Sequence, residues 1–478
     1  MSVRLVSTSV RRPAPHARLR SQSGRLATGV LAAVLALTLL GQLRGDTPAS
    51  PPRPLELTAA TTNPVTPGNF TGYGFDQCVA PTQAKMDAWL ENSPFLSVGI
   101  YISGNSRACR SQPNLTPAWV TRQLVQGWRL LPITLGPQAS CSVRYPKYKD
   151  DPTINPDPTS SYAKAKAQGK LEAERAVTAA KALGLAPAST LFYDLEGFDL
   201  GNTRCRQSAV AFMHAWTLRV HGLSYKSGFY SSAGSGIKML DDVAKTSPGV
   251  ALPDQLWIAR WDGLANTTVS SAYLSPTAWL PGRRVKQYQG GHNETWGGVT
   301  INIDRNFLDL GNSTPAAERH CSGIRIDLVR YSAVKPPTAS AVPNATRVKA
   351  LQCLLREKAV YTGAINGLYN TATQAAAMKW QKSLGFRTST TWGVKDWMSI
   401  LSAGHRPVLK IGSRGVYVRR AQRAMQAAVP TLEIKIDGIF DAEMASDVQA
   451  YRAKIGMPRA GIVSTATWAN LQVGKFVS

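Results

Sequence analysis

The chain has 478 residues, enough for two or three domains of about 100–200 residues each. Hydrophobic residues make up 44% of it and charged residues 18%, which excludes an intrinsically disordered protein. Lysine and arginine number 55 against 29 acidic residues, so the formal net charge is +26. Such a balance favours anionic partners: nucleic acid, a membrane surface or a charged wall polymer.

The N-terminus has the pattern of an export segment. Six arginines and no acidic residue lie within the first 25 positions, and an uncharged apolar run follows from Leu26 to Leu43. A basic region before an apolar region is typical of a signal peptide, and the run is of marginal length for a membrane anchor. We therefore expect a signal peptide or N-terminal anchor over residues 1–45, a Pro/Thr-rich linker over 46–68, and a secreted, wall-associated protein.

Six cysteines in an exported chain predict disulfides, whose pairing the sequence leaves open. Cys353 lies in an apolar helical pattern, VKALQCLL, and is predicted to be a buried thiol. No C-x-x-C or H-E-x-x-H spacing occurs, so we expect no metal site and no cofactor.

Short apolar runs alternate with amphipathic stretches between Gly72 and Asp309. Strands are expected at 72–76, 95–102, 128–135, 190–196, 226–231, 255–261, 284–288 and 300–307, and helices near 82–91, 117–126, 161–183, 206–221 and 235–245. Alternating strands and helices indicate parallel pairing. Eight strands over this length predict a (β/α)₈ TIM-type barrel within residues 69–331. The alternative is a doubly wound open sheet, but no G-x-G-x-x-G follows the first strand.

The C-terminal third contains an internal duplication. After a linker at 332–343, RVKALQ at 347–352 matches YVRRAQ at 417–422, and INGLY at 365–369 matches IDGIF at 436–440. The regular offset of 70 or 71 residues indicates two related units. We expect small three-helix modules over 344–404 and 405–478. Residues 344–478 hold 19 basic and 7 acidic side chains, a net charge of +12 (19 − 7).

These units resemble the peptidoglycan-binding-domain-like repeat of wall hydrolases. The motif residues are Val348, Leu351-Gln352, Asn366-Gly367-Leu368-Tyr369, Trp380-Gln381 and Trp397, and in the second copy Val418, Ala421-Gln422, Asp437-Gly438-Ile439-Phe440, Tyr451 and Thr467-Trp468. Both copies depart from the family at the glycine after the aromatic, where Asn370 and Asp441 stand. The resemblance implies a wall glycan as ligand.

Residues 72–310 are similar to the glycoside-hydrolase-like domain of exported actinobacterial proteins, which is distantly similar to family-25 lysozymes. The motifs are Gly74-Phe75-Asp76, Tyr193-Asp194-Leu195-Glu196-Gly197, Gly228-Phe229-Tyr230-Ser231-Ser232, Leu256-Trp257-Ile258-Ala259-Arg260-Trp261, Lys286-Gln287-Tyr288 and Asn302-Ile303-Asp304. The resemblance implies a barrel and a saccharide ligand, and leaves turnover open.

Carboxylates follow several of the expected strands. Asp194 and Glu196 alternate on one strand, so both are expected to point the same way. Asp76 and Asp304 end the first and last strands, which become neighbours when a barrel closes. Crowded carboxylates supply the protonated and ionised pair that glycoside hydrolysis requires. The sequence therefore predicts a catalytic site at the carboxyl ends of the strands.

We expect Glu196 to act as general acid and Asp194 to stabilise the oxocarbenium charge or assist the substrate's N-acetyl group. Asp76 and Asp304 are expected to orient groups or water. The predicted substrate-binding residues are Gln287 and Arg260 as hydrogen-bonding groups, Tyr230, Trp257 and Trp261 as apolar faces, and Asp262 beside them.

The leading hypothesis is a monomeric, wall-associated hydrolase of the lysozyme type, acting on peptidoglycan and held at the wall by its two C-terminal modules. A second hypothesis is a wall-binding or remodelling-control protein with a barrel that lacks turnover. The third is an extracellular nucleic-acid binder, which the predicted export makes the least favoured of the three.

Overall fold

The computed structural model describes residues 62–144 and 150–476. The predicted export segment and most of the linker after it lie outside the described residues. Among the helices that are described, none is long and apolar enough to cross a membrane.

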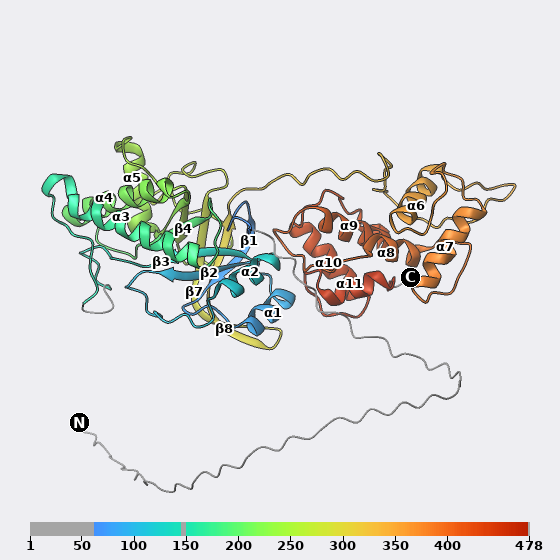
Figure 1. Ribbon diagram of the computed structural model, residues 1–478, viewed down its shortest axis with the longest axis horizontal. Helices are drawn as coiled ribbons and strands as arrows, with labels where there is room; N and C mark the ends of the chain where they lie inside the picture. The colour runs from blue at the N-terminus through green and yellow to red at the C-terminus, as the bar shows by residue number, and fades with distance from the viewer. Residues whose placement is uncertain (1–61, 145–149, 477–478) are drawn as a thin grey trace, which may run out of the picture. The chain divides into compact units, whose positions relative to one another are not determined.

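Eight strands close into a barrel in chain order, with helices on its outside (Figure 1). The strands are β1 (Thr71–Asp76), β2 (Ser97–Ser103), β3 (Arg129–Thr134), β4 (Thr190–Asp194), β5 (Lys226–Ser232), β6 (Gln255–Ala259), β7 (Arg284–Trp296) and β8 (Val299–Asp309). The helices of this part are α1 (Gln83–Asn92), α2 (Pro117–Val125), α3 (Thr159–Ala182), α4 (Thr203–Gly222) and α5 (Lys238–Thr246). The barrel prediction is thus confirmed as a closed eight-stranded barrel with interleaved helices.

The last strand corrects the prediction of an all-parallel (β/α)₈ barrel. β1 to β7 pair in parallel, but β8 runs antiparallel to both β7 and β1. Two glycines with positive φ, Gly297 and Gly298, join β7 to β8 in a tight hairpin. A two-residue turn returns the chain antiparallel, because a parallel crossover needs a dozen residues or more. No described helix stands between β6 and β7 either.

Side-chain caps fix where the outer helices begin. Thr82, Thr116 and Asn202 accept hydrogen bonds from backbone N–H groups in the first turns of α1, α2 and α4. Each cap satisfies one of the amides that a helix start leaves without an internal partner. The caps therefore fix the first residues of these helices, and the loops between the strand ends and the helices form the rim of the barrel.

Three disulfides are formed: Cys78–Cys109, Cys141–Cys205 and Cys321–Cys353. The prediction of a free thiol at Cys353 is wrong, because the segment after the barrel returns to α6 and brings Cys321 to it. The first disulfide joins the loops that follow β1 and β2, and the second joins the loop after β3 to the first turn of α4. Three disulfides in one chain are typical of an extracytoplasmic protein.

The C-terminal part is helical and has three helices in each repeat. They are α6 (Ala345–Glu357), α7 (Thr371–Ser383), α8 (Val394–Ser402), α9 (Val416–Ala428), α10 (Ala442–Lys454) and α11 (Thr465–Gln472). The helices share one apolar core, in which Trp397 of the first repeat and Trp468 of the second are fully buried. Each repeat is thus a three-helix unit, but the two units pack as one body.

The repeated N/D-G motif has a structural cause. The side-chain oxygen of Gln352 accepts the N–H of Gly367 at 2.9 Å, and Gln422 does the same to Gly438. Both glycines have φ near +80°, a conformation that glycine adopts without steric cost. The buried glutamine and the glycine are therefore structural residues that hold the turn against the first helix of each repeat.

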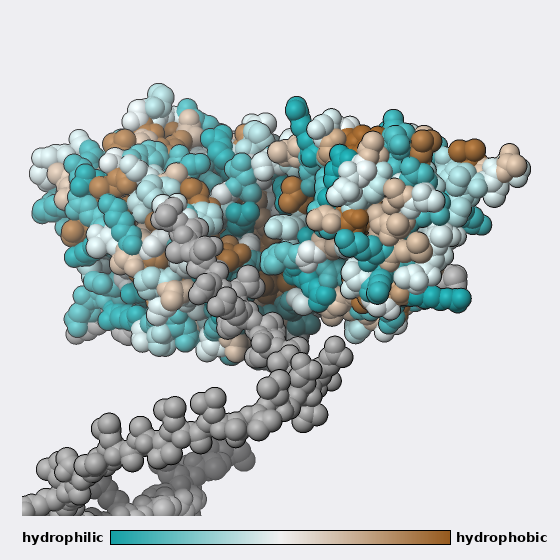
Figure 2. Space-filling model, turned by 45° about the vertical axis from the view of Figure 1, so that its right-hand side comes forward, coloured by the Kyte–Doolittle hydropathy of each residue, from teal (hydrophilic) through white to brown (hydrophobic). Residues whose placement is uncertain are grey.

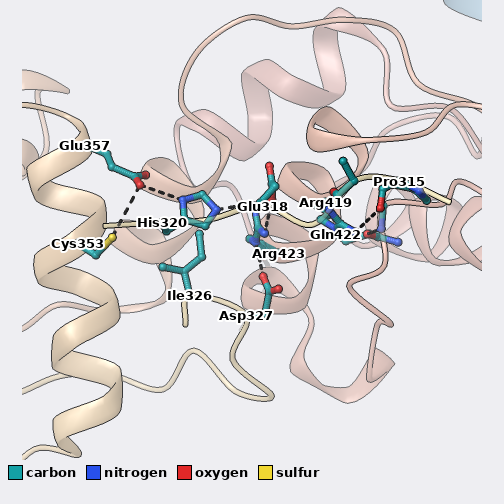
Figure 3. A network of polar contacts seen from close by, with 12 residues as sticks. Pro315, Glu318, His320, Ile326, Asp327, Cys353, Glu357, Arg419, Gln422 and Arg423 are labelled. Carbon is teal, nitrogen blue, oxygen red and sulfur yellow. Dashed lines mark hydrogen bonds and ion pairs between the residues drawn. The ribbon is translucent and has the colours of Figure 1, made fainter. Parts of the chain in front are cut away.

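A polar network links the segment after the barrel to both repeats (Figure 3). His320 bonds Glu357 of α6 at 2.9 Å, and Glu318 pairs with Arg423 of α9. Arg423 also pairs with Asp327 at 2.5 Å. The carboxylates of Glu318 and Glu357 raise the pKa of His320 to about 9, so the imidazole is charged at neutral pH. Alternating charges therefore extend from α6 to α9.

The surface is predominantly hydrophilic on the face shown in Figure 2, with apolar residues scattered singly or in small groups. Scattered apolar residues are ordinary for a folded chain and indicate no binding site by themselves.

Candidate functional site

Three of the predicted carboxylates, Asp76, Asp304 and Glu196, line one cavity near the carboxyl end of β1. Asp76 is the last residue of β1, and its Cα is paired with that of Asp304 in β8. Glu196 lies two residues beyond the end of β4. Asp304 is therefore beside Asp76 as predicted, although it lies in the middle of an antiparallel strand rather than at a strand end.

Two cavities open at this end of the barrel, and Glu196 lines both. The larger has a volume of about 580 Å³, and its lining includes Tyr230, Arg260 and Trp261. The smaller has a volume of about 270 Å³, and Asp76 and Asp304 line it. A chain-like ligand that occupied both cavities would therefore have its middle part beside Glu196.

Asp76 and Asp304 form a coupled pair. Nε2 of Gln287 donates to Oδ2 of Asp76 at 3.1 Å and to Oδ2 of Asp304 at 3.3 Å, and Asn306 donates to Asp76 at 2.6 Å. Burial, with the charge of Asp304 as second cause, raises the pKa of Asp76 well above its ordinary value. Burial also raises the pKa of Asp304. The pair therefore retains a proton at a pH where isolated aspartates are ionised.

The hydrogen bonds of Gln287 differ from its predicted role as a hydrogen-bonding group for substrate. Its Oε1 accepts from the hydroxyl of Tyr230 at 3.0 Å and from the indole N–H of Trp261 at 2.9 Å, while its Nε2 serves the two aspartates. The side chain is 3% exposed. All its hydrogen-bonding capacity is used inside the protein, so Gln287 positions the site instead of bonding substrate directly.

Asp194 and Glu196 do not share one environment, contrary to the prediction from alternation. β4 ends at Asp194, so the alternation of faces does not extend to Glu196. Asp194 is buried, whereas Glu196 is half-buried and lines both cavities. Gln138 fixes the backbone here, because it accepts the N–H of Glu196 and donates to the carbonyl of Asp194, each at 2.8 Å. Asp194 lines neither cavity.

The three predicted aromatic faces divide between core and surface. Trp257 is 1% exposed and donates to Asn306 at 2.7 Å inside the barrel, so its predicted role as a sugar platform is wrong. Trp261 is 64% exposed at the larger cavity. Tyr230 is half-buried there, and burial together with the charge of Glu196 raises its pKa well above the ordinary value. Trp261 is the aromatic face that remains available to a sugar ring.

The last two predicted binding residues differ in position. Arg260 lines the larger cavity and lies 5.5 Å above the ring of Tyr273. Asp262 lines neither cavity. Its Oδ2 accepts a hydrogen bond from the buried ammonium group of Lys286, with 3.0 Å between Oδ2 and Nζ. Asp262 therefore anchors the loop after Trp261, which corrects its predicted contact with substrate.

Four site residues were not predicted from the sequence: Asn306, Gln138, Tyr101 and Arg107. Asn306 had a usable signal, since it lies two positions after Asp304 on the same face of a strand. Gln138 and Arg107 lie in loops, where no periodicity indicates which way a side chain points.

The barrel part of the chain resembles a glycoside hydrolase-like domain. Residues 87–308 match the family described as "Rv2525c-like, glycoside hydrolase-like domain". Among curated proteins, none matches the chain.

Several solved structures are similar to the barrel half. An uncharacterized B. stearothermophilus protein has 19% identity and a TM-score of 0.32, covering 50% of this chain and 95% of its own. The Tat-secreted protein Rv2525c of Mycobacterium tuberculosis has 12% identity and a TM-score of 0.33, with coverage of 50% and 95%. The modular autolysin LytC of Streptococcus pneumoniae has 10% identity and a TM-score of 0.31, with coverage of 50% and 46%.

Proposed function

We propose that the barrel is an exported glycoside hydrolase acting on peptidoglycan-type glycan, and that the C-terminal repeats hold it at the wall. The observation that carries this proposal is the position of Glu196 between two cavities, next to a proton-retaining pair of aspartates. Glycoside hydrolysis requires one carboxyl group that donates a proton and another that stays ionised.

In this mechanism the glycan lies across both cavities, with the bond to be broken at Glu196. Glu196 protonates the leaving oxygen as general acid. The shared negative charge of Asp76 and Asp304 faces the developing oxocarbenium ion and orients the attacking water. Asp194 adds negative charge from beneath, and Trp261 offers its face to a sugar ring in the larger cavity.

The repeats contribute by raising local concentration. A module that binds the same polymer weakly keeps the cleft near its substrate without any new contact in the cleft. The net charge of +12 on residues 344–478 supports attraction to an anionic wall.

The test is release of reducing sugar from purified peptidoglycan and from chitin-type oligomers by the full chain. Glu196→Gln is expected to abolish release while glycan binding persists. Glu174→Gln removes a surface ion pair with Arg219 on the outer helices and serves as the matched control, with activity retained. Equal release by wild type and Glu196→Gln would assign the chemistry to another residue.

The second candidate is a wall-binding protein without turnover. The burial of Asp194 and Asp76, at 2% and 4% exposure, favours it, because neither carboxylate can be freely reached by a ligand. It predicts that wild type and Glu196→Gln both sediment with the wall and that neither releases sugar.

A further inference from the structure

A third cavity lies outside the barrel, between α3, α4 and α5, which are neighbours in Figure 1. Its volume is about 1090 Å³, larger than either cavity at the mouth. Aliphatic side chains form much of its lining: Leu200, Val210, Ala211, Met239, Val243 and Val250. An aliphatic groove between helices suits a segment that carries small aliphatic side chains.

Three basic side chains line the same groove beside its aliphatic residues, which form its floor. Lys166 comes from α3, Arg206 from α4 and Lys238 from α5, and all three are half-buried. Asp242 is the one acidic residue in the lining, and Lys238 already binds both its oxygens at 3.0 Å. Within the described residues, no carboxylate forms an ion pair with Lys166 or Arg206. Two half-buried cations without a carboxylate partner favour an anionic ligand.

Ser161 and Tyr162 line the groove and lie in a segment with an unusual backbone. Ser160, Ser161 and Tyr162 have φ of 52°, 56° and 62°, a conformation that residues with a side chain seldom adopt in succession. The hydroxyl of Tyr162 donates to Gln207 of α4 at 2.5 Å. This bond holds the start of α3 against α4. The side chains of Tyr162 and Gln207 place polar groups beside the aliphatic residues of the groove.

The groove adjoins the cleft along the chain. Asp199 lines the larger mouth cavity, and the next two residues, Leu200 and Gly201, line the groove. Cys141, which lines the same mouth cavity, is bonded to Cys205, the residue before Arg206. Residues that line the cleft and residues that line the groove are therefore consecutive in the chain at 199–201, and the Cys141–Cys205 disulfide links the two linings.

We propose that this groove binds the short acidic peptide that a peptidoglycan strand carries. The peptide's small aliphatic side chains lie on the floor, and its carboxylates meet Lys166 and Arg206. The inference rests on the proposed function, since it assigns the cleft to the glycan and the groove to its peptide. It makes the substrate class a peptide-substituted glycan, with Lys166 and Arg206 as specificity-determining residues.

The test measures binding of N-acetylated alanyl-γ-glutamyl-diaminopimelyl-alanine to the full chain by calorimetry. Lys166→Gln is expected to weaken binding about tenfold, and Lys166→Glu further, because a half-desolvated charge pair is lost or reversed. Lys170→Gln removes an exposed charge from the same helix outside the groove, so its affinity should equal that of wild type. Thermal melting checks that all variants fold.

Charge recognition is tested with the same peptide after its carboxylates are amidated, which should bind at least about tenfold more weakly. Equal affinity of wild type and Lys166→Glu for the acidic peptide would refute the groove, as would binding of a polyol phosphate in preference to the peptide. Cleavage of chitin-type oligomers is measured in parallel. Cleavage without peptide binding refutes the groove alone, whereas charge-dependent peptide binding without cleavage supports the groove and refutes the proposed hydrolase.

Discussion

Replacing Asp304 by asparagine tests the coupling of the two aspartates directly. Gln287 donates to Oδ2 of Asp76 at 3.1 Å and to Oδ2 of Asp304 at 3.3 Å, so these oxygens cannot lie further apart than the sum of the two distances, 6.4 Å. Two unit charges at that limiting separation repel by about 2.6 kcal/mol at an effective dielectric constant of about 20, and a shorter separation increases the repulsion. The Asp304→Asn substitution would remove this repulsion and leave a side chain of nearly the same shape.

The expected effect depends on pH in a defined direction. Both aspartates have raised pKa values in the folded protein, so the folded state holds protons that the unfolded state has released. Their contribution to stability is complete below the ordinary pKa of aspartate and is lost as the pH rises through the raised values. Asp304→Asn should therefore match wild type near pH 3.5 and exceed it by roughly 2 kcal/mol at pH 8.

Urea unfolding at a series of pH values, followed by tryptophan fluorescence, measures this difference. Asp309→Asn, on the same strand, is the control for the loss of a carboxylate outside the pair. A difference between Asp304→Asn and wild type that is the same at pH 4 and pH 8 would show that the carboxylates do not interact.

Three further outcomes follow from the structure. Cys353→Ser opens a disulfide that spans 32 residues, and should lower the free energy of unfolding by about 3–4 kcal/mol in urea titrations without reductant; an unchanged midpoint would contradict this. His320→Gln should destabilise the chain at pH 6, where wild-type His320 is charged, and the difference should disappear as the pH rises through about 9; a constant difference between pH 6 and 10 would exclude the ion-pair role. Trp261→Ala should lower affinity for chitin-type oligomers about tenfold in calorimetry and leave the melting temperature unchanged, because the ring is 64% exposed. Unchanged affinity would refute a contact between this ring and the sugar.

The barrel and the meeting of Asp76 with Asp304 could be predicted because they depend on strand order alone. Alternating apolar runs indicate the number of strands, and closure brings the first strand beside the last. The direction of β8 could not be predicted in the same way. It depends on a hairpin at Gly297 and Gly298 within a polar stretch, and on the absence of a described helix before it.

The individual site roles were predicted less well, because sequence position does not specify how far a side chain is buried. Trp257 and Trp261 lie four residues apart, yet the first is inside the barrel and the second is 64% exposed at the larger cavity. An amide such as that of Gln287 suits a sugar hydroxyl, which is why the sequence favoured a ligand contact. Its two ends are instead taken by partners from β1, β5, β8 and the loop after β6, which only the closed barrel brings together.

Cys353 shows a different limit. An apolar helical pattern predicts burial correctly, and Cys353 is indeed fully buried. The pattern does not show which other segment reaches that face of the helix. The partner, Cys321, belongs to a non-helical segment whose fixed position depends on Glu318 and His320, a network for which the sequence has no periodic signal.

The coupled aspartates bear on the choice between hydrolase and binding protein. A buried pair of like charges costs stability at neutral pH, and an asparagine at either position would remove the cost while preserving hydrogen bonds to Gln287. A protein that only binds glycan gains nothing from a retained proton, because amides and hydroxyls hold sugars without it. A hydrolase needs carboxyl groups of unequal protonation within reach of one bond. If Asp304→Asn proves more stable and loses sugar release while still binding glycan, the cost of the pair is explained by catalysis.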